Sequence, residues 1–112
     1  MRLCTIKTMR EEASQKGFAL GAFEFWSLES AQIVARSAQA FGVPVILQCG
    51  EAEARHAGGY DVMRTLVEIA AGEVDIPIAL HLDHATDVAQ VRRAIDAGFT
   101  SVMIDKSNCP YD

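Results

Sequence analysis

Residues 76–104, IPIALHLDHATDVAQVRRAIDAGFTSVMI, decide the fold of this 112-residue chain. The stretch opens on one apolar run, residues 76–81, and closes on another, residues 100–104. Between them, residues 87–97 carry apolar side chains at spacings of three and four, as on one face of a helix: Val88, Val91, Ala94 and Ile95. Two continuous apolar strands joined by a helix are typical of a parallel βαβ unit that is buried on both faces.

The same alternation extends toward the N-terminus. Apolar runs predict strands at residues 18–23 and 43–48, and periodic segments predict helices at residues 28–41 and 62–72. A charged segment, residues 5–16, predicts a leading helix, and a loop with Gly50, Gly58 and Gly59 is expected after the second strand. The expected N-caps are Thr5 or Thr8, Ser27, Asp61 and Thr86, and the expected helix-ending glycines are Gly17, Gly42 and Gly98. The apolar helix faces expected to be buried also include Ala31, Val34, Ala35, Ala38, Phe41, Val62, Leu66, Ile69 and Ala70.

The order of elements, a helix followed by β-α-β-α-β-α-β, predicts an α/β fold with a parallel sheet. Two architectures fit: an open doubly wound sheet, or parallel (β/α) units that form about half of a TIM (β/α)8 barrel with an N-terminal helix. A complete (β/α)8 barrel has eight strands and roughly 250 residues, so a chain with four strands corresponds to about half of one. An open flavodoxin-like domain is less favoured, because the sequence has no glycine-rich phosphate loop. Residues 1–112 are expected to form one domain.

Composition excludes several classes of function. Lysine and arginine number 10 and aspartate and glutamate 15, a net charge of −5 that gives no footprint for nucleic acid or an anionic membrane. No apolar run approaches the roughly 18 residues of a membrane span, and the N-terminus lacks the apolar core of a secretion signal. Three scattered cysteines, Cys4, Cys49 and Cys109, fit a reducing compartment. We therefore expect a cytoplasmic protein.

Chemistry in parallel α/β folds sits at the carboxyl ends of the strands, where the motif His81-Leu82-Asp83-His84 is expected. A neutral imidazole suits Zn²⁺, and a carboxylate beside a metal ion can act as a general acid or base. His81 and Asp83 would share one face of a continuing strand, with His84 pointing elsewhere. The alternative is structural: these side chains bind strand-end carbonyls and cap the next helix. Cys49 has no base beside it in the sequence, so we expect an inert buried thiol.

Residues 79–105, ALHLDHATDVAQVRRAIDAGFTSVMID, resemble the class II, metal-dependent ketose-bisphosphate aldolases. The upstream segments GFALGAF, SLES and VPVILQ fit the same family. The resemblance implies that residues 1–112 are the N-terminal half of a TIM-barrel aldolase. It also implies a lyase of carbohydrate metabolism and glycolysis that reversibly cleaves fructose- or tagatose-bisphosphate to dihydroxyacetone phosphate and an aldehyde.

The resemblance also implies roles for individual residues. Asp83 matches the catalytic acid/base, and His84 matches a ligand of a Zn²⁺ cofactor. His81 and Asp105 match supporting positions of the site, whereas no substrate-binding residue is assigned. The implied partners are a phosphorylated ketose or dihydroxyacetone phosphate, and further copies in a homo-oligomer.

Four residues depart from the family pattern. Glu24 stands where the family has Asn, Gly50 where it usually has Ser, Lys106 where it has Gly, and Asn108 where it has His. The other zinc histidines and the phosphate-binding loops belong to later strands, so this chain is expected to be inactive alone. The alternative is a non-catalytic, aldolase-like remnant or assembly subunit that pairs through the open edges of its sheet.

Overall fold

A computed structural model describes residues 3–111, in which helices and strands alternate. The order is α1 (Ile6–Lys16), β1 (Ala22–Glu24), α2 (Leu28–Phe41), β2 (Val45–Cys49), α3 (Glu51–Ala57), α4 (Tyr60–Ala71), β3 (Ile78–Ala85), α5 (Val88–Ala97) and β4 (Ser101–Ile104). The strands form one parallel sheet in the order β1-β2-β3-β4. Within residues 3–111, no helix has both the length and the apolar character needed to cross a membrane.

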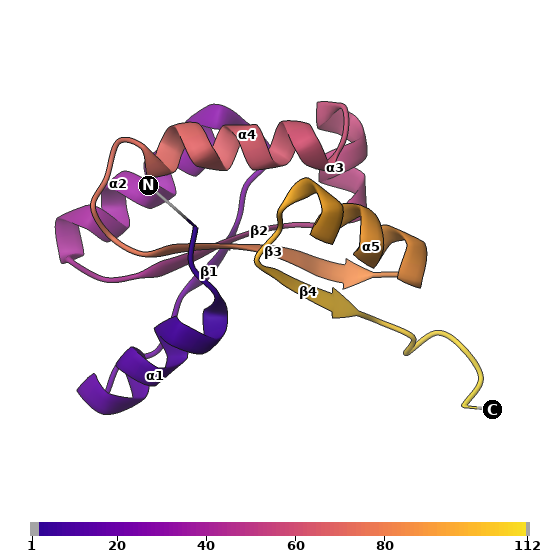
Figure 1. The fold of residues 1–112 in the computed structure, drawn as a ribbon, viewed down its shortest axis with the longest axis horizontal. Coiled ribbons are helices and arrows are strands. Elements are labelled where there is room, and N and C mark those ends of the chain that lie inside the picture. Colours follow the sequence, from indigo (N-terminus) through magenta and orange to yellow (C-terminus); the bar gives the residue numbers. More distant parts are fainter. Residues whose placement is uncertain (1–2, 112) are drawn as a thin grey trace.

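The layers of the structure distinguish the two architectures. Helices α2 to α5, which connect successive strands, all lie on one side of the sheet, and α1 lies on the other (Figure 1). In a doubly wound sheet the crossover helices cover both faces and the strand order reverses at a switch point. Sequential strand order with every crossover on one face is the arrangement of a (β/α)8 barrel. The structure therefore confirms the half-barrel and excludes the doubly wound sheet.

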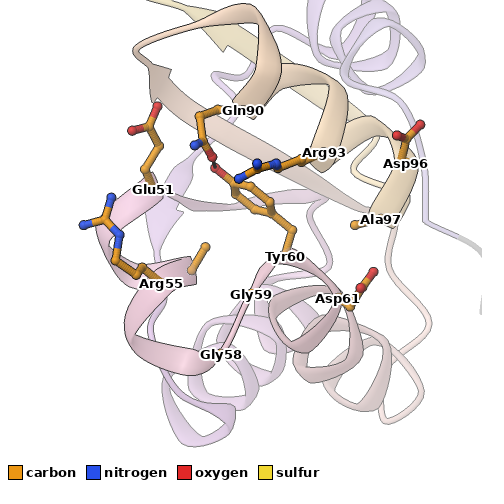
Figure 2. A pocket seen from close by; sticks show the side chains of 11 residues that line it. Glu51, Arg55, Gly58, Gly59, Tyr60, Asp61, Gln90, Arg93, Asp96 and Ala97 are labelled. Atoms are coloured by element: carbon orange, nitrogen blue, oxygen red, sulfur yellow. Dashed lines mark hydrogen bonds between the residues drawn. The ribbon is translucent and has the colours of Figure 1, made fainter.

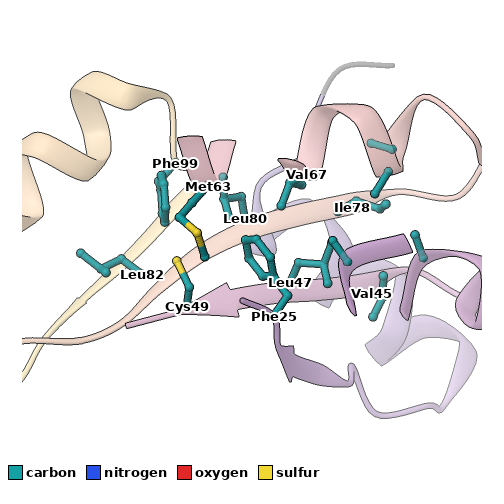
Figure 3. Packing of buried hydrophobic residues seen from close by; sticks show 14 of the residues in the cluster. Phe25, Val45, Leu47, Cys49, Met63, Val67, Ile78, Leu80, Leu82 and Phe99 are labelled. Atoms are coloured by element: carbon teal, nitrogen blue, oxygen red, sulfur yellow. The ribbon is translucent and has the colours of Figure 1, made fainter. Parts of the chain in front are cut away.

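The main hydrophobic core lies between the sheet and its crossover helices. Leu47 of β2 and Leu80 of β3 are fully buried there, together with Met63 and Val67 of α4 (Figure 3). A smaller core lies on the opposite face, where Met9 of α1 packs against Ile46 and Ala79 together with their neighbours. These two cores bury both faces of β2 and β3, which explains why those strands are continuously apolar.

The helix boundaries agree in part with the sequence prediction. Helix α2 begins and ends as predicted, with Ser27 as the N-cap, and Thr5 caps α1. The expected caps Asp61 and Thr86 are wrong: α4 is capped by Gly59, and α5 by Asp87, whose side chain accepts from the Gln90 N–H at 2.9 Å. Thr86 instead donates to Glu51 through its hydroxyl, at 2.8 Å, and through its backbone N–H.

Two elements differ more strongly from the prediction. Helix α3 occupies part of the expected glycine-containing loop; it is one short helix with one buried residue, Ala54, so it has no apolar periodicity to detect. Strand β3 continues to Ala85 rather than ending at residue 81, and β1 is restricted to Ala22–Glu24. The HLDH motif therefore lies inside a strand and not after it.

Several helix residues expected to be buried are exposed. Phe41 is 82% exposed, and Ile69, Val88 and Ile95 are each about half exposed. In α2 the buried residues are Ala31, Ala35 and Ala38, whose small side chains let the helix lie close to the sheet. These four larger side chains lie on parts of the helices that none of residues 3–111 covers fully.

A substitution in the main core tests this packing. Leu47→Ala is expected to lower the free energy of unfolding by about 2–5 kcal/mol, because it removes buried methyl groups and leaves a cavity. The matched control is Ile33→Ala, at a side chain that is 65% exposed, with an expected change within about 0.5 kcal/mol. Urea unfolding followed by circular dichroism measures both, and equal effects would contradict the assignment of the core.

Candidate functional site

A row of polar side chains crosses the sheet near its carboxyl end. The parallel register pairs Glu24 with Gln48, Gln48 with His81, and His81 with Ser101. Gln48 Nε2 donates to Glu24 Oε1 at 3.1 Å, and His81 Nδ1 lies 2.7 Å from Ser101 Oγ. Because side chains alternate along a strand, this row lies on the same face as Ile46 and Ala79, which α1 covers. The face is thus apolar beneath α1 and polar toward the carboxyl edge.

An irregularity in β3 shapes the edge of the site. The register with β4 shifts between Leu82 and Ala85, and His84 has a φ of 47°. A positive φ is uncommon for a residue with a Cβ and marks local backbone strain. At this bulge the His84 side chain is 61% exposed, while the Asp83 side chain is 25% exposed.

The His84 ring lies between two carboxylates. Its Nδ1 is 2.8 Å from Asp105 Oδ2, and its Nε2 is 3.6 Å from Asp83 Oδ1. Asp105 follows β4 and is itself held by the Ser107 backbone N–H, which donates to Oδ1 at 2.9 Å. The structure therefore brings together three of the four predicted site residues and holds the fourth, His81, on the neighbouring polar row.

These contacts shift the titration of the site. The pKa of His84 is raised, first by its hydrogen bond to Asp105 and then by the charge of Asp83. The pKa of Asp105 falls to about 2, chiefly because Ser107 donates hydrogen bonds to it and then because His84 does. Burial lowers the pKa of His81, which favours a neutral imidazole beside Ser101.

The donor set fits one part of a metal site. A metal-binding histidine usually has its second ring nitrogen held by a carboxylate or carbonyl, as Asp105 holds Nδ1 of His84. Nε2 of His84, beside Asp83, is then the nitrogen that could bind a metal ion. A catalytic zinc ion normally has three protein ligands, and no group of three or more His, Cys, Asp or Glu residues in positions 3–111 could hold one. Among residues 3–111, His84 thus fits as a single metal ligand and not as part of a complete set.

Some site contacts were not apparent from the sequence. Ser101 lies in an apolar run, and only the register of β3 with β4 places it beside His81. Glu53 belongs to the unexpected helix α3 and accepts from the Gly50 N–H at 2.9 Å. Lys106 donates to the backbone oxygen of Thr86 and so links the β4 exit to the β3–α5 connection.

A separate pocket of about 650 Å³ lies between α3, α4 and α5, on the helical side of the sheet. Arg55 and Arg93 border it, and the Tyr60 hydroxyl donates to Gln90 Oε1 at 2.7 Å (Figure 2). None of the four predicted site residues lines this pocket. It is therefore distinct from the polar row and the HLDH motif.

Comparison with known proteins connects this geometry to one family. Residues 4–112 match the family model described as fructose-bisphosphate aldolase class-II. The chain is 38% identical over 114 residues to a fructose-bisphosphate aldolase of Staphylococcus aureus strain Mu50, and 38% identical to a probable fructose-bisphosphate aldolase of Bacillus subtilis strain 168. The match covers 100% of this chain but 40% of each relative.

Solved structures give the same result for the fold. The YdjI aldolase of Escherichia coli K12 superposes with a TM-score of 0.85 over 97% of this chain and 41% of that protein, at 23% identity. A putative fructose-1,6-biphosphate aldolase of Coccidioides immitis superposes with a TM-score of 0.80 over 92% of this chain and 40% of that protein, at 28% identity. The chain thus has the fold of two-fifths of an aldolase barrel.

The contact between His84 and Asp105 predicts a pH-dependent change. Asp105→Asn removes the carboxylate charge that raises the pKa of His84, so that pKa is expected to fall. In the metal-free protein the ion pair stabilises the fold below the ordinary histidine pKa, and this stabilisation is lost as the pH rises through the raised pKa. A proton NMR titration of the imidazole signals measures the shift. Asp96→Asn, at an exposed residue of α5, is the control, and an equal shift in both variants would contradict the contact.

Burial predicts that Cys49 is chemically inert. Its side chain is fully buried, and its pKa is raised to about 12, first by burial and then by the charges of Glu24, Glu53 and Asp83. Because the thiolate is the reactive form, iodoacetamide at pH 8 is expected to label the exposed Cys109 and to spare Cys49 until the protein is unfolded in urea. Peptide mass spectrometry measures the labelling, and Cys109→Ser identifies the fast site. Rapid native labelling of Cys49 would contradict its burial.

Proposed function

Since this chain belongs to the class II fructose-bisphosphate aldolase family, we propose that it contributes the proton-transfer group and one metal ligand of an aldolase active site. The proposed reaction is the reversible cleavage of fructose- or tagatose-bisphosphate to dihydroxyacetone phosphate and an aldehyde. The observation that carries the proposal is the arrangement of His84 between Asp83 and Asp105 at the carboxyl edge of the sheet.

Asp83 is the proposed acid/base. Its partly exposed carboxylate can take the proton of the substrate hydroxyl next to the carbon–carbon bond that breaks. That oxygen becomes the carbonyl of the aldehyde, and the electron pair of the broken bond passes into the enediolate of dihydroxyacetone phosphate. Protonated Asp83 then returns the proton to the enediolate carbon, which completes the cycle.

His84 is the proposed zinc ligand, and Asp105 orients it. Because the ionised Asp105 carboxylate can only accept a hydrogen bond, Nδ1 of His84 carries the proton and donates it. Nε2 of His84 then has a free lone pair. When bound, the metal ion supplies a positive charge that polarises the substrate ketone. His81, hydrogen-bonded to Ser101, supports the polar face beside Asp83.

The chain spans about two-fifths of the curated relatives it matches, so the remaining ligands and the phosphate-binding groups are proposed to come from outside residues 1–112. We place this activity in the cytoplasm and in a homo-oligomer, with residues 1–112 acting as part of one barrel domain.

A non-catalytic assembly role is the second candidate function. Among residues 3–111, β1 and β4 each pair on one side only, and apolar side chains of both strands are about half exposed, as in Phe23 and Ile104. Open edges of this kind favour pairing with further strands. A protein that pairs in this way without any metal-dependent cleavage would support the second candidate.

Variants of the two central residues, made in the proposed complete barrel that contains residues 1–112, test the aldolase proposal. Asp83→Asn is expected to lower kcat for fructose 1,6-bisphosphate cleavage by about 10²–10⁴-fold with bound zinc unchanged, because it removes proton transfer alone. His84→Ala is expected to lower both bound zinc and activity. A coupled assay of dihydroxyacetone phosphate and elemental analysis of zinc measure these effects.

Asp61→Asn is the control, because Asp61 lies in α4 and apart from the HLDH motif. Its activity and zinc content are expected to equal those of the unmodified protein. Full activity of Asp83→Asn, or full zinc content of His84→Ala, would contradict the corresponding role.

A further inference from the structure

Glu24 has a buried carboxyl oxygen that no N–H group of the described residues satisfies. The residue ends β1 and lies partly buried in the polar row beside Gln48. Oε1 accepts from Gln48, Oε2 is buried and accepts from no N–H group of residues 3–111, and the Asp83 carboxyl group lies within hydrogen-bonding reach of the Glu24 side chain. A buried acceptor without a donor is costly, so a ligand that brings a donor to this corner gains stability there.

A second carboxylate, that of Glu53, lies close to the same corner. Glu53 Oε2 accepts from the Gly50 N–H at 2.9 Å. A Cβ added at Gly50 would lie 2.8 Å from that oxygen, so a side chain at position 50 would displace the Glu53 carboxylate. Glycine at position 50 therefore leaves room for a negative charge at the end of β2.

These carboxylates act on one another, and the imidazole of His84, 3.6 Å from Asp83, is the cationic partner that they have nearby. Burial is the main cause of the raised pKa of Glu24, and the charges of Glu53 and Asp83 raise it further. Within residues 3–111, none of the three forms an ion pair with lysine or arginine. The corner thus repels a phosphate dianion, whereas a hydroxyl group can donate a hydrogen bond to it.

We propose that Glu24 determines substrate specificity: the site takes a ketose phosphate whose end facing β1 and β2 carries a free hydroxyl rather than a second phosphate. This inference rests on the proposed aldolase function. It replaces a ketose bisphosphate with a ketose monophosphate as the preferred substrate of the proposed cleavage. The hydroxyl donates to the Glu24 carboxylate, and the charges of Glu53 and Asp83 add to the exclusion of a terminal phosphate.

Two probes that differ by one phosphate test the inference. The proposed complete barrel that contains residues 1–112 is loaded with zinc and assayed for cleavage of fructose 1-phosphate and of fructose 1,6-bisphosphate. The ratio of the two kcat/KM values is then compared between the unmodified protein and its variants. For the unmodified protein, kcat/KM for the monophosphate is expected to exceed kcat/KM for the bisphosphate by at least about tenfold. Glu24→Gln keeps the shape of the side chain and removes its charge, so this ratio is expected to fall by about tenfold. Glu11→Gln, at an exposed residue of α1, is expected to leave the ratio unchanged.

Two further measurements keep the test decisive if Glu24→Gln fails to fold. Potassium chloride screens charge repulsion, so the preference of the unmodified protein is expected to narrow as salt rises. Glu53→Gln, which keeps an acceptor for the Gly50 N–H, is expected to shift the ratio in the same direction.

The outcomes distinguish failure of the specificity role of Glu24 from failure of the proposed aldolase function. Cleavage of both probes with a ratio that neither salt nor the variants change would overturn the role of Glu24 and leave the aldolase function standing. A preference for the bisphosphate would do the same. If the proposed complete barrel binds zinc but cleaves neither probe, the proposed function itself is overturned.

Discussion

The parallel register of the four strands is the constraint on which the site depends. It aligns Glu24, Gln48 and His81 across three strands that are far apart in the sequence, and it places Ser101 beside His81. Each of these residues has its partner because the hydrogen-bond ladder fixes which side chains are neighbours. A shift by one residue would turn the whole polar row toward the hydrophobic core.

The bulge in β3 adds a second element to this arrangement. The register shift and the positive φ of His84 turn its imidazole out to the edge, where it meets Asp105 at 2.8 Å. Strain of this kind persists only when surrounding contacts hold it. Here the contacts are the carboxylate of Asp105, which is anchored by Ser107, and the sheet on both sides of β3.

One face of the sheet carries the main hydrophobic core, and the other face carries the polar side chains of the candidate site. Leu47, Leu80 and the buried side of α4 stabilise the helical face. On the other face α1 covers only the row of Ile46 and Ala79, so the next row toward the carboxyl edge holds Gln48 and His81. The negative charge of that edge, from Glu24, Glu53 and Asp83, gives it a chemical character that the apolar core does not have.

The sequence by itself determined the fold class, the extent of α2, and the HLDH motif with Asp105, because periodicity and local motifs are written in neighbouring residues. It also supported the family resemblance, which the comparisons confirm. It did not reveal α3, which has one buried residue, or the extension of β3, whose polar end resembles a loop. Only the tertiary structure decided that His84 meets Asp105, that Ser101 meets His81, and that Glu53 lies near Glu24. These contacts join residues 20 or more positions apart, and strand register and a backbone bulge, which leave no local pattern, create them.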